Sequence, residues 1–383
     1  MRESLHLVDT TMFWSPTGGG VRRYVQTKHE WLSARPGIRH SIAVPQVAGS
    51  AADDATLPSV ALPASGGYRL PLDRAAIARV LVGLRPDLIE VGDPYRVAWG
   101  ALDAARTLGV PAVAYCHSNL EAMARLAGGP LVGDAAARLA RRYAHHLYAN
   151  FDLVLAPSRA MAGHLEAAGI ARVAVQPLGV DTAAFHPGRA NPSWRAALGL
   201  DASARLLVYA GRFAAEKHLD VLVAAVARLG APYHLVAVGA GPRPPQGERV
   251  HVLPFVAGAE GLAEVLASAD VFVHAGDQET FGLSVLEAFA CGTPAVVRGT
   301  EGLAELVDDG TGIAVDQGSA GAFAAAIATM FDRDPRSFAA ATRARAEASD
   351  WQRVLPELLE RYRGLIESRR GRADAATATK AFA

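Results

Sequence analysis

Short apolar runs alternate with longer helical patterns along this chain, and the alternation occurs twice. In the first half, candidate strands lie at Leu5–Asp9, His40–Val44, Leu88–Val91, Ala112–Cys116, Leu153–Ala156 and Val173–Gln176. In the second half, they lie at Leu206–Ala210, His234–Val238, Val250–Leu253, Val271–His274, Ala295–Val297 and Ile313–Val315. Strands that alternate with helices form a parallel sheet covered on both faces. Two such series predict an α/β protein with two Rossmann-like, doubly wound domains.

The change from the first series to the second is predicted near residue 182, where Gly and Pro interrupt the pattern. This gives an N-terminal domain over residues 1–182 and a C-terminal domain over residues 183–351. A chain of 383 residues is also too long for one hydrophobic core. Past the second domain the sequence predicts an amphipathic helix from Val354 to Ile366, and the small, polar stretch 371–383 is expected to be disordered.

Composition and charge narrow the classes of partner. The 38 Lys and Arg residues balance the 38 Asp and Glu residues, so no strong field attracts a nucleic acid. The apolar stretch from Leu5 to Val8 is too short for a signal peptide, and no run of about 18 apolar residues could span a membrane. Cys116 and Cys291 lie far apart in the sequence, which is typical of free thiols in a reducing compartment. We expect a cytoplasmic protein that touches a membrane, if at all, from the surface of its inner face.

In open parallel sheets, ligands bind outside the carboxyl ends of the strands. The strongest pattern follows the strand that ends at His274: Glu279 lies in a loop, and Glu287 lies inside the next helix. The amides of Gly282–Ser284, at the start of this helix, form an anion site of the kind that holds a diphosphate. Carboxylates on either side of a diphosphate suit the hydroxyl groups of a sugar and a ribose. The alternative, an acidic residue favouring the helix dipole and one solvated glutamate, explains either residue but not their spacing.

A second pattern follows the strand that ends at Ala210. Gly211-Arg212 and then Glu216-Lys217 place two cations just past the end of a strand. A nucleoside diphosphate gathers negative charge as it leaves, and fixed cations stabilise that charge most in the transition state. Arginine supplies a planar fork for phosphate oxygens, and lysine supplies a point charge. Taken alone, the two residues are also explained as ordinary surface charges.

Weaker signals lie in the N-terminal half. Gly18-Gly19-Gly20 precedes a predicted helix, and glycines let the backbone approach a ligand closely, although a flexible loop explains the run as well. His117 follows a strand at the edge where ligands bind, although a packed histidine is an equally simple explanation. Asp9, at the end of the first strand, is a further candidate.

Two other patterns do not predict a site. Gly239-Ala-Gly241 begins like a dinucleotide fingerprint, but Pro244 stands where the third glycine should be. Asp332-Arg-Asp334 imitates a metal-binding pair, but it lies in an Ala-rich helical region away from the strand ends. No metal site is therefore predicted.

The stretch that contains Glu279 and Glu287, with Phe281, Gly282 and Leu283 in register between them, resembles the E-x7-E motif of glycosyltransferase family 4. These are retaining enzymes of the GT-B fold. The resemblance implies that Glu287 holds the ribose hydroxyls of a nucleotide and that Glu279 contacts the transferred sugar. It also implies that the amides of Phe281, Gly282 and Leu283 bind sugar hydroxyls or phosphate.

Other residues fall on motifs of the same family. Arg212 and Lys217 match its G-R-x-x-x-x-K pattern, which implies that they stabilise the departing diphosphate. His218 departs from the pattern, because the family often has glycine there. The family's N-terminal glycine loop, which faces the diphosphate, and its active-site histidine correspond to Gly19, Gly20 and His117.

The resemblance implies a hexosyltransferase whose two domains face a cleft and whose last helix, about 352–370, crosses back to the N-terminal domain. The C-terminal domain would bind a nucleotide-diphospho-sugar, GDP-mannose or a UDP-hexose, and the N-terminal domain would bind the acceptor. No cofactor or metal is expected, because GT-B enzymes commonly work without a metal. The predicted reaction is retaining transfer of a hexosyl group, with mannosyl as one candidate, to a lipid, lipid-linked or glycan acceptor.

One predicted helix, Arg138–Ala149, bears on the acceptor and on contact with a membrane. Leu139, Tyr143 and Leu147 lie on it beside a basic set formed by Arg138, Arg141, Arg142, His145 and His146. Such a helix could lie on anionic lipid, and an ordinary helix with a solvated basic face is the alternative.

Two other functional classes stay open. A GT-B epimerase or phosphorylase is not expected to carry the Glu-x7-Glu register, and a silent binding protein would lose His117 or Glu279.

Overall fold

The computed structural model describes residues 4–15, 19–45, 55–63, 65–256 and 258–381. The chain forms two compact units, each an α/β layer structure, which confirms the predicted fold class. Unit 1 comprises Met1–Gln176 and Val354–Ala383, and unit 2 comprises Pro177–Arg353. The division after Gln176 lies slightly before the change predicted near residue 182.

The main sheet of unit 1 has seven strands in the order β3-β2-β1-β6-β7-β8-β9, and all its neighbours are parallel. Its strands are β1 (Leu5–Thr10), β2 (Ile38–Pro45), β3 (Ala55–Leu57), β6 (Leu88–Val91), β7 (Ala112–Tyr115), β8 (Leu153–Ala156) and β9 (Val173–Val175). A separate antiparallel pair joins β4 (Val60–Ala61) to β5 (Arg69–Leu70). Because β1 lies between β2 and β6, the strand order reverses beside β1, where doubly wound sheets bind ligands.

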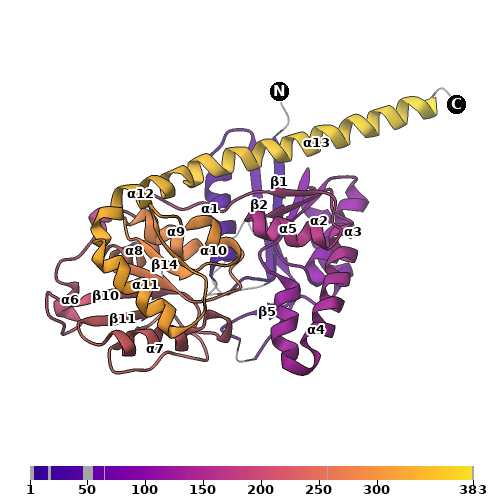
Figure 1. Cartoon of the computed structure of the whole chain (residues 1–383). Helices are drawn as coiled ribbons and strands as arrows, with labels where there is room; N and C mark the ends of the chain where they lie inside the picture. Colours follow the sequence, from indigo (N-terminus) through magenta and orange to yellow (C-terminus); the bar gives the residue numbers. More distant parts are fainter. Residues whose placement is uncertain (1–3, 16–18, 46–54, 64, 257, 382–383) are drawn as a thin grey trace. The chain divides into compact units, whose positions relative to one another are not determined.

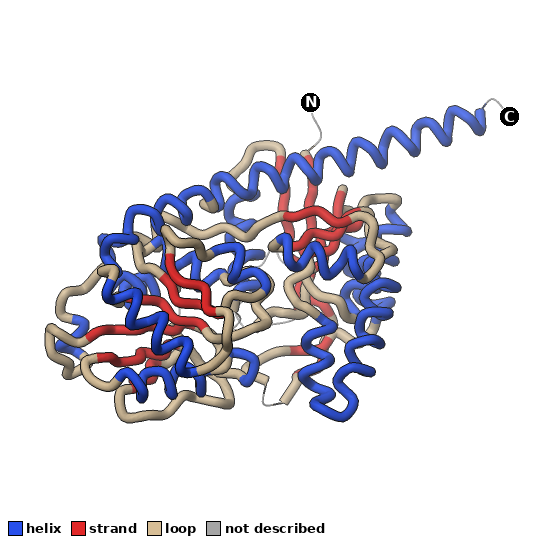
Figure 2. The backbone as a smooth tube through the Cα atoms, in the orientation of Figure 1, coloured by secondary structure: helices blue, strands red, loops and turns tan. Residues whose placement is uncertain are grey.

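Helices cover this sheet, as the blue segments around the red strands of unit 1 show in Figure 2. They are α1 (Gly20–Ser33), α2 (Arg74–Leu84), α3 (Arg96–Leu108), α4 (Leu120–Tyr148), α5 (Arg159–Ala167) and α13 (Trp351–Ala381). Side-chain caps fix three of their starts: Asp73 caps α2, Asn119 caps α4 and Ser158 caps α5. The sequence predicts a helix only over Arg138–Ala149, whereas α4 begins at Leu120 and turns back at Gly129-Pro130.

Helix α13 differs from its prediction at the C-terminal end. Residues from Gly371 onward are expected to be disordered, but the helix continues to Ala381 (yellow in Figure 1). The stretch is rich in Ala with Arg and Lys, which are strong helix formers. Along the first half of the helix, Val354, Leu358 and Tyr362 are buried, as the predicted amphipathic pattern requires.

Unit 2 contains a six-stranded parallel sheet in the order β12-β11-β10-β13-β14-β15. The strands are β10 (Arg205–Ala210), β11 (Tyr233–Val238), β12 (Val250–Leu253), β13 (Val271–His274), β14 (Ala295–Arg298) and β15 (Gly312–Val315). The order reverses beside β10, which lies between β11 and β13. This places the loops after β10 and β13 next to each other, at the edge where ligands bind.

The helices of unit 2 include α6 (Trp194–Ala197), α7 (Leu219–Leu229), α8 (Ala259–Ser268), α9 (Leu283–Ala290), α10 (Glu301–Leu306), α11 (Ala320–Asp332) and α12 (Ala339–Ala348). Short 3-10 turns are η1 (Pro187–Arg189), η2 (Ala215–Lys217) and η3 (Pro335–Phe338). The inner strands β10, β13 and β14 are apolar along almost their whole length and buried, as expected for a sheet covered on both faces.

Candidate active site

In unit 2, the loops after β10 and β13 bring together three of the predicted residues. The Lys217 ammonium forms an ion pair with the Glu279 carboxylate. Nε2 of His274, the last residue of β13, lies 3.2 Å from Oε1 of the same carboxylate. The structure therefore gathers Lys217 and Glu279 as the sequence predicts, and adds His274 to them.

The position of His274 follows from one backbone hydrogen bond. The amide of Gly276 donates to Nδ1 of His274 at 3.2 Å, so Nδ1 is an acceptor and Nε2 carries the hydrogen that points at Glu279. From the sequence, His274 is predicted only as the end of a strand. Its place at the ligand-binding edge was the available signal, since a histidine there can orient a carboxylate.

The carboxylate of Glu279 is held in its ionised form. Burial favours the neutral acid, but the charge of Lys217 and the hydrogen bond from His274 together hold the pKa of Glu279 well below its usual range. The backbone of Glu279 is fixed as well, because the amide of Gly302 donates to its carbonyl oxygen at 2.9 Å. A fixed anion beside a fixed cation suits a polar ligand that carries both hydroxyl and phosphate groups.

Helix α9 begins beside this loop. Gly282 precedes the helix with φ 96°, and a Cβ there would stand 2.6 Å from Cδ2 of Leu303, so both backbone and space require glycine. The amides of Leu283 and Ser284, in the first turn, have no acceptor within the helix. Phe281, which precedes Gly282 in the chain, is buried. The local geometry is that of an anion site at a helix N-terminus.

Glu287 lies one turn into α9 and is buried, with 2% of its surface exposed. A glutamate on the outer face of a short helix would be solvated, so the alternative of one solvated glutamate does not apply here. Burying a carboxylate is costly unless polar groups surround it, which is typical of binding sites. Glu279 and Glu287 thus lie on either side of the first turn of α9.

Arg212 follows β10 and is exposed, with Nη2 2.5 Å from Oε1 of Glu216. Its loop packs tightly against the loop of Gly239-Ala-Gly241, where a Cβ on Gly241 would stand 2.4 Å from the carbonyl oxygen of Phe213. These glycines therefore serve the close approach of two backbones. In this structure both predicted cations, Arg212 and Lys217, contact a carboxylate.

His218, where the family often has glycine, adopts a left-handed conformation with φ 48°. That conformation explains the glycine, because it costs other residues about 1–2 kcal/mol. Nε2 of His218 lies 3.4 Å from Oδ1 of Asp277, in the loop that leads to Glu279. The departure therefore leaves Lys217 in place and adds a contact between the two loops.

His117 lies in unit 1, just past β7. Its ring stacks on Tyr115 with centroids 4.4 Å apart, and Tyr24 of α1 lies 5.4 Å away. A Cβ on Gly92, after β6, would stand 3.6 Å from Cδ2 of His117. Burial, helped by the charge of Lys28, lowers the pKa of His117 to about 3, so the ring is neutral at physiological pH.

The glycine loop opens α1. Gly18 lies outside the described residues, whereas Gly19 precedes the helix and Gly20 is its first residue. Among the described residues, no atom lies within 4 Å of where a Cβ on Gly19 would stand. The described neighbours therefore leave room for a side chain at this position, and the role of Gly19 in donor binding stays a prediction.

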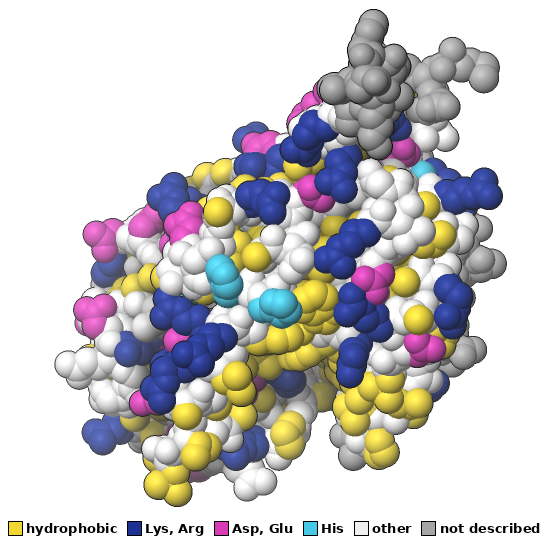
Figure 3. Space-filling view, turned by 90° about the vertical axis from the view of Figure 1, so that its right-hand side faces the viewer, with side chains coloured by type: hydrophobic (Ala, Val, Ile, Leu, Met, Phe, Trp, Pro, Cys, Tyr) yellow, Lys and Arg dark blue, Asp and Glu magenta, His cyan; other side chains and the backbone are white. Residues whose placement is uncertain are grey.

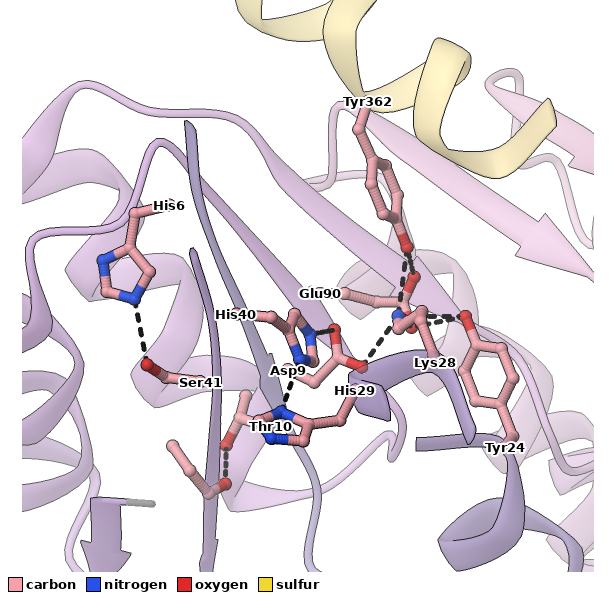
Figure 4. A network of polar contacts seen from close by, with 11 residues as sticks. His6, Asp9, Thr10, Tyr24, Lys28, His29, His40, Ser41, Glu90 and Tyr362 are labelled. Atoms are coloured by element: carbon pink, nitrogen blue, oxygen red, sulfur yellow. Dashed lines mark hydrogen bonds and ion pairs between the residues drawn. The ribbon is translucent and has the colours of Figure 1, made fainter. Parts of the chain in front are cut away.

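A buried ionic network in unit 1 was not predicted (Figure 4). Lys28 of α1 is 1% exposed, and its Nζ lies 2.7 Å from Oδ2 of Asp9 and 2.6 Å from Oε1 of Glu90. The hydroxyls of Tyr24 and Tyr362 lie 3.0 and 3.2 Å from Nζ. Burial opposes ionisation of Asp9, but Lys28 and His40 hold its pKa below the usual range. Asp9 is thus a buried member of this cluster, and its interpretation as a candidate site residue stays a prediction.

Asp93, just past β6, is a second residue that the sequence analysis missed. It accepts hydrogen bonds from the amides of Met12 at 2.7 Å and Tyr95 at 3.1 Å. It therefore fixes the loop after β1 that leads toward Gly19. Burial raises the pKa of Asp93 to about 6, although these hydrogen bonds favour the charged form.

The described residues contain no group of three or more His, Cys, Asp or Glu side chains placed to hold a metal ion. None of the described helices combines the length and the apolar character needed to cross a bilayer.

Two Rossmann-like units, one of them with a cation–carboxylate cluster beside a helix N-terminus, define a glycosyltransferase of the GT-B class. Two family models match the chain: that of Glycosyltransferase Family 4 over residues 18–184 and that of Glycosyl transferases group 1 over residues 204–333.

A GDP-mannose-dependent alpha-(1-6)-phosphatidylinositol dimannoside mannosyltransferase of Mycobacterium tuberculosis is 33% identical over 383 residues, covering 93% of this chain and 95% of that protein. A GDP-mannose-dependent alpha-mannosyltransferase of Mycolicibacterium smegmatis is 32% identical over 326 residues, 83% of this chain and 84% of that protein. In fold, the chain matches sucrose-phosphate synthase from Thermosynechococcus elongatus with a TM-score of 0.78 at 22% identity, over 95% of this chain and 100% of that chain.

The chain belongs to glycosyltransferase family 4. It is a hexosyltransferase that takes its sugar from a nucleotide sugar. The predictions of family, fold class and enzyme class are therefore confirmed.

Proposed function

We propose that this enzyme transfers a mannosyl group from GDP-mannose, with retention of configuration, to a lipid-borne acceptor. The observation that carries the proposal is the cluster of Lys217, Glu279 and His274 beside the first turn of α9, with Glu287 buried in the same helix. The donor and the sugar are inferred from the two relatives, which are both named as GDP-mannose-dependent. A UDP-hexose is the alternative donor.

Different residues of the site bind the diphosphate, the ribose and the mannose of the donor. The diphosphate binds the amides at Phe281–Leu283 and the cations Arg212 and Lys217, because these positive groups lie in the loops after β10 and β13. Glu287 accepts hydrogen bonds from the ribose hydroxyls, and Glu279 accepts them from the mannose. Lys217 then bridges Glu279 and the diphosphate, which aligns the sugar with its leaving group.

The chemical step breaks the bond between C1 of mannose and the phosphate oxygen, and forms a bond from C1 to the acceptor oxygen. The proton of the acceptor hydroxyl passes to the departing phosphate. Arg212 and Lys217 stabilise the charge that develops there, which is worth roughly 2–4 kcal/mol for each preorganised group. His117, as a neutral imidazole, hydrogen-bonds the sugar or the acceptor in this scheme. No cofactor and no metal ion takes part.

Unit 1 supplies the acceptor site in this proposal, as the N-terminal half of the family is expected to do. The Mycobacterium tuberculosis relative is named for a phosphatidylinositol dimannoside acceptor, and its identity to this chain extends over 93% of the sequence. A lipid acceptor of that kind would bring the enzyme to the inner face of the membrane as a peripheral protein.

Donor choice and reaction class are tested with the full chain. Thermal shifts with GDP, UDP, GDP-mannose and UDP-glucose should rank the guanine nucleotides first. Radiolabelled mannose from GDP-mannose should then enter the lipid fraction of a mycobacterial extract, and it should do so in excess chelator. NMR of the product should show an α-mannoside. Preference for a UDP-sugar would overturn the donor, a β-linked product would overturn retention, and loss of activity in chelator would overturn metal independence.

A further inference from the structure

Helix α4 exposes an unusual amount of apolar surface for a protein of balanced composition. Of the large hydrophobic side chains that the structure describes as exposed, five lie on this helix: Met123, Leu126, Leu131, Val132 and Leu139. Leu131 is 94% exposed, Leu139 69% and Val132 58%. Large side chains in such positions are costly in water and mark a surface that another apolar phase covers.

The backbone of α4 concentrates these residues. The helix is broken at Gly129, which has φ 60° and ψ −164°, and Pro130 follows, so the two arms run back along each other (Figure 1). The arms pack closely, because a Cβ on Gly133 would stand 2.5 Å from the carbonyl oxygen of Arg125. We call the turn and its apolar residues Met123, Leu126, Leu131 and Val132 the hairpin tip.

The inner face of the second arm is already covered. Leu147 is fully buried, and the hydroxyl of Tyr143 donates to the carbonyl oxygen of Pro94 at 2.6 Å. The hypothesis that Tyr143 and Leu147 face lipid is therefore wrong, because both belong to the packed side of the helix. Leu139 alone of that set is exposed, so the apolar surface in question is the hairpin tip and Leu139.

The charges on α4 are mostly positive. Glu121 and Asp134 both contact the guanidinium of Arg125, at 3.5 and 3.0 Å, so the single charge of Arg125 offsets one of their two negative charges. Arg138 and Arg142 remain exposed on the second arm, on either side of Leu139 in the sequence. Figure 3, viewed from the side on which α3, α4 and α5 lie in Figure 1, shows hydrophobic side chains gathered on the lower part of this face, with basic side chains (dark blue) above them.

We infer that the hairpin tip inserts into an anionic lipid bilayer and that Arg138 and Arg142 contact the lipid headgroups. Apolar side chains flanked by arginines are the pattern of interfacial membrane contact, where each basic residue near the surface contributes about 1 kcal/mol. A second copy of this chain fits the same surface poorly. In a symmetric dimer the same patch would face itself and bring the arginines of both copies together.

The membrane contact also sets the distance between the bilayer and the residues near His117. This step rests on the proposed function. Helix α4 begins at Leu120, directly after Asn119 and close in sequence to His117. Its first arm, Leu120–Gly128, is about 13 Å long at 1.5 Å per residue. A bilayer at the hairpin tip would therefore lie on the order of 13 Å from the start of α4, which follows His117 closely in the sequence.

The experiment measures co-sedimentation of the full chain with vesicles of phosphatidylglycerol and phosphatidylcholine, and with phosphatidylcholine alone. Leu131→Asp/Val132→Asp and Arg138→Glu/Arg142→Glu should each bind the anionic vesicles at least tenfold more weakly than the native chain. The matched controls are Val252→Ser, an exposed apolar side chain of unit 2, and Arg228→Glu, a charge reversal on α7. Both controls should bind like the native chain.

Native-like binding by both α4 double variants overturns the inference, as does native-chain binding that is absent or equal on the two vesicle types. A native chain that sediments as a dimer, and becomes a monomer in Leu131→Asp/Val132→Asp, overturns it in favour of a second copy. Binding of GDP to unit 2, measured by calorimetry on every variant, reports folding separately. If GDP fails to bind the native chain while the vesicle results hold, the donor proposal fails and the membrane contact stands.

Discussion

Replacing Lys28 by Met tests what the buried network contributes to unit 1. The Lys28 ammonium lies 2.7 Å from Asp9 and 2.6 Å from Glu90, and its side chain is almost inaccessible to water. Met is close in length, so packing is largely kept, but two buried carboxylates lose their cation. Breaking a buried pair in this way costs about 3–5 kcal/mol. That is a large share of the 5–15 kcal/mol that holds a typical domain together.

The loss should be confined to unit 1. Hydrogen exchange followed by mass spectrometry should show reduced protection in peptides of β1, α1 and β6, and native protection in β10 and β13. Urea unfolding gives the size of the change. Tyr143→Phe is the matched control, because it removes only the neutral hydrogen bonds of one hydroxyl in the same unit, to Pro94 and from Trp99, and should cost about 1–2 kcal/mol.

A second change separates charge from packing. Glu90→Gln added to Lys28→Met removes one of the two uncompensated charges and should recover part of the lost stability, since burial already raises the pKa of Glu90. A loss below about 1 kcal/mol for Lys28→Met, or a further loss on adding Glu90→Gln, would refute the view that the network is a compensated buried ion cluster.

Three further predictions concern single groups. Because the pKa of His117 is about 3, His117→Gln should lower kcat without altering the shape of the pH–rate profile between pH 5 and 8; loss of an inflection on substitution would contradict a neutral imidazole. Folding raises the pKa of Asp93 from 3.8 to about 6, so the folded state keeps a proton that the unfolded state releases, and stability falls as pH rises between these values. Relative to Asp93→Asn, the native chain should lose about 2 kcal/mol between pH 4 and pH 6 in urea unfolding, and a flat difference would contradict the shift. His218→Gly should raise the unfolding free energy by about 0.5–1 kcal/mol, because it relieves the left-handed conformation and gives up only a weak contact to Asp277; a decrease would show that this contact outweighs the strain.

The fold was readable from the sequence because parallel sheets leave a simple signal. Strands such as Val271–His274 are continuous apolar runs between helical patterns, and that pattern repeats through both units. The loops after β10 and β13 lie next to each other because the strand order reverses beside β10. That strand order could not be predicted from the sequence. The motif around Glu279 and Glu287 was found because its spacing is specific.

What was missed depends on contacts between residues far apart in the chain. Lys28 and Tyr362 meet across 334 positions, and nothing in the local pattern of α1 distinguishes a buried lysine from an exposed one. The strand-end position of His274 was a signal in the sequence, but the hydrogen bond from Gly276 that directs its Nε2 at Glu279 was not. The turn in α4 had a signal, since Gly128-Gly129-Pro130 is a strong helix breaker, but the exposure of Leu131 and Val132 beyond it did not.

The division of the donor between Glu279 and Glu287 is the central claim about the site, and isothermal calorimetry of Glu279→Gln and Glu287→Gln tests it most directly. The titrants are GDP and GDP-mannose. Glu287→Gln should weaken both by about 1–3 kcal/mol, because a charged hydrogen-bond acceptor for the ribose is lost. Glu279→Gln should leave GDP affinity nearly unchanged and weaken only the interaction with the mannose, and with it transfer. Equal weakening of bare GDP by the two variants would contradict the account.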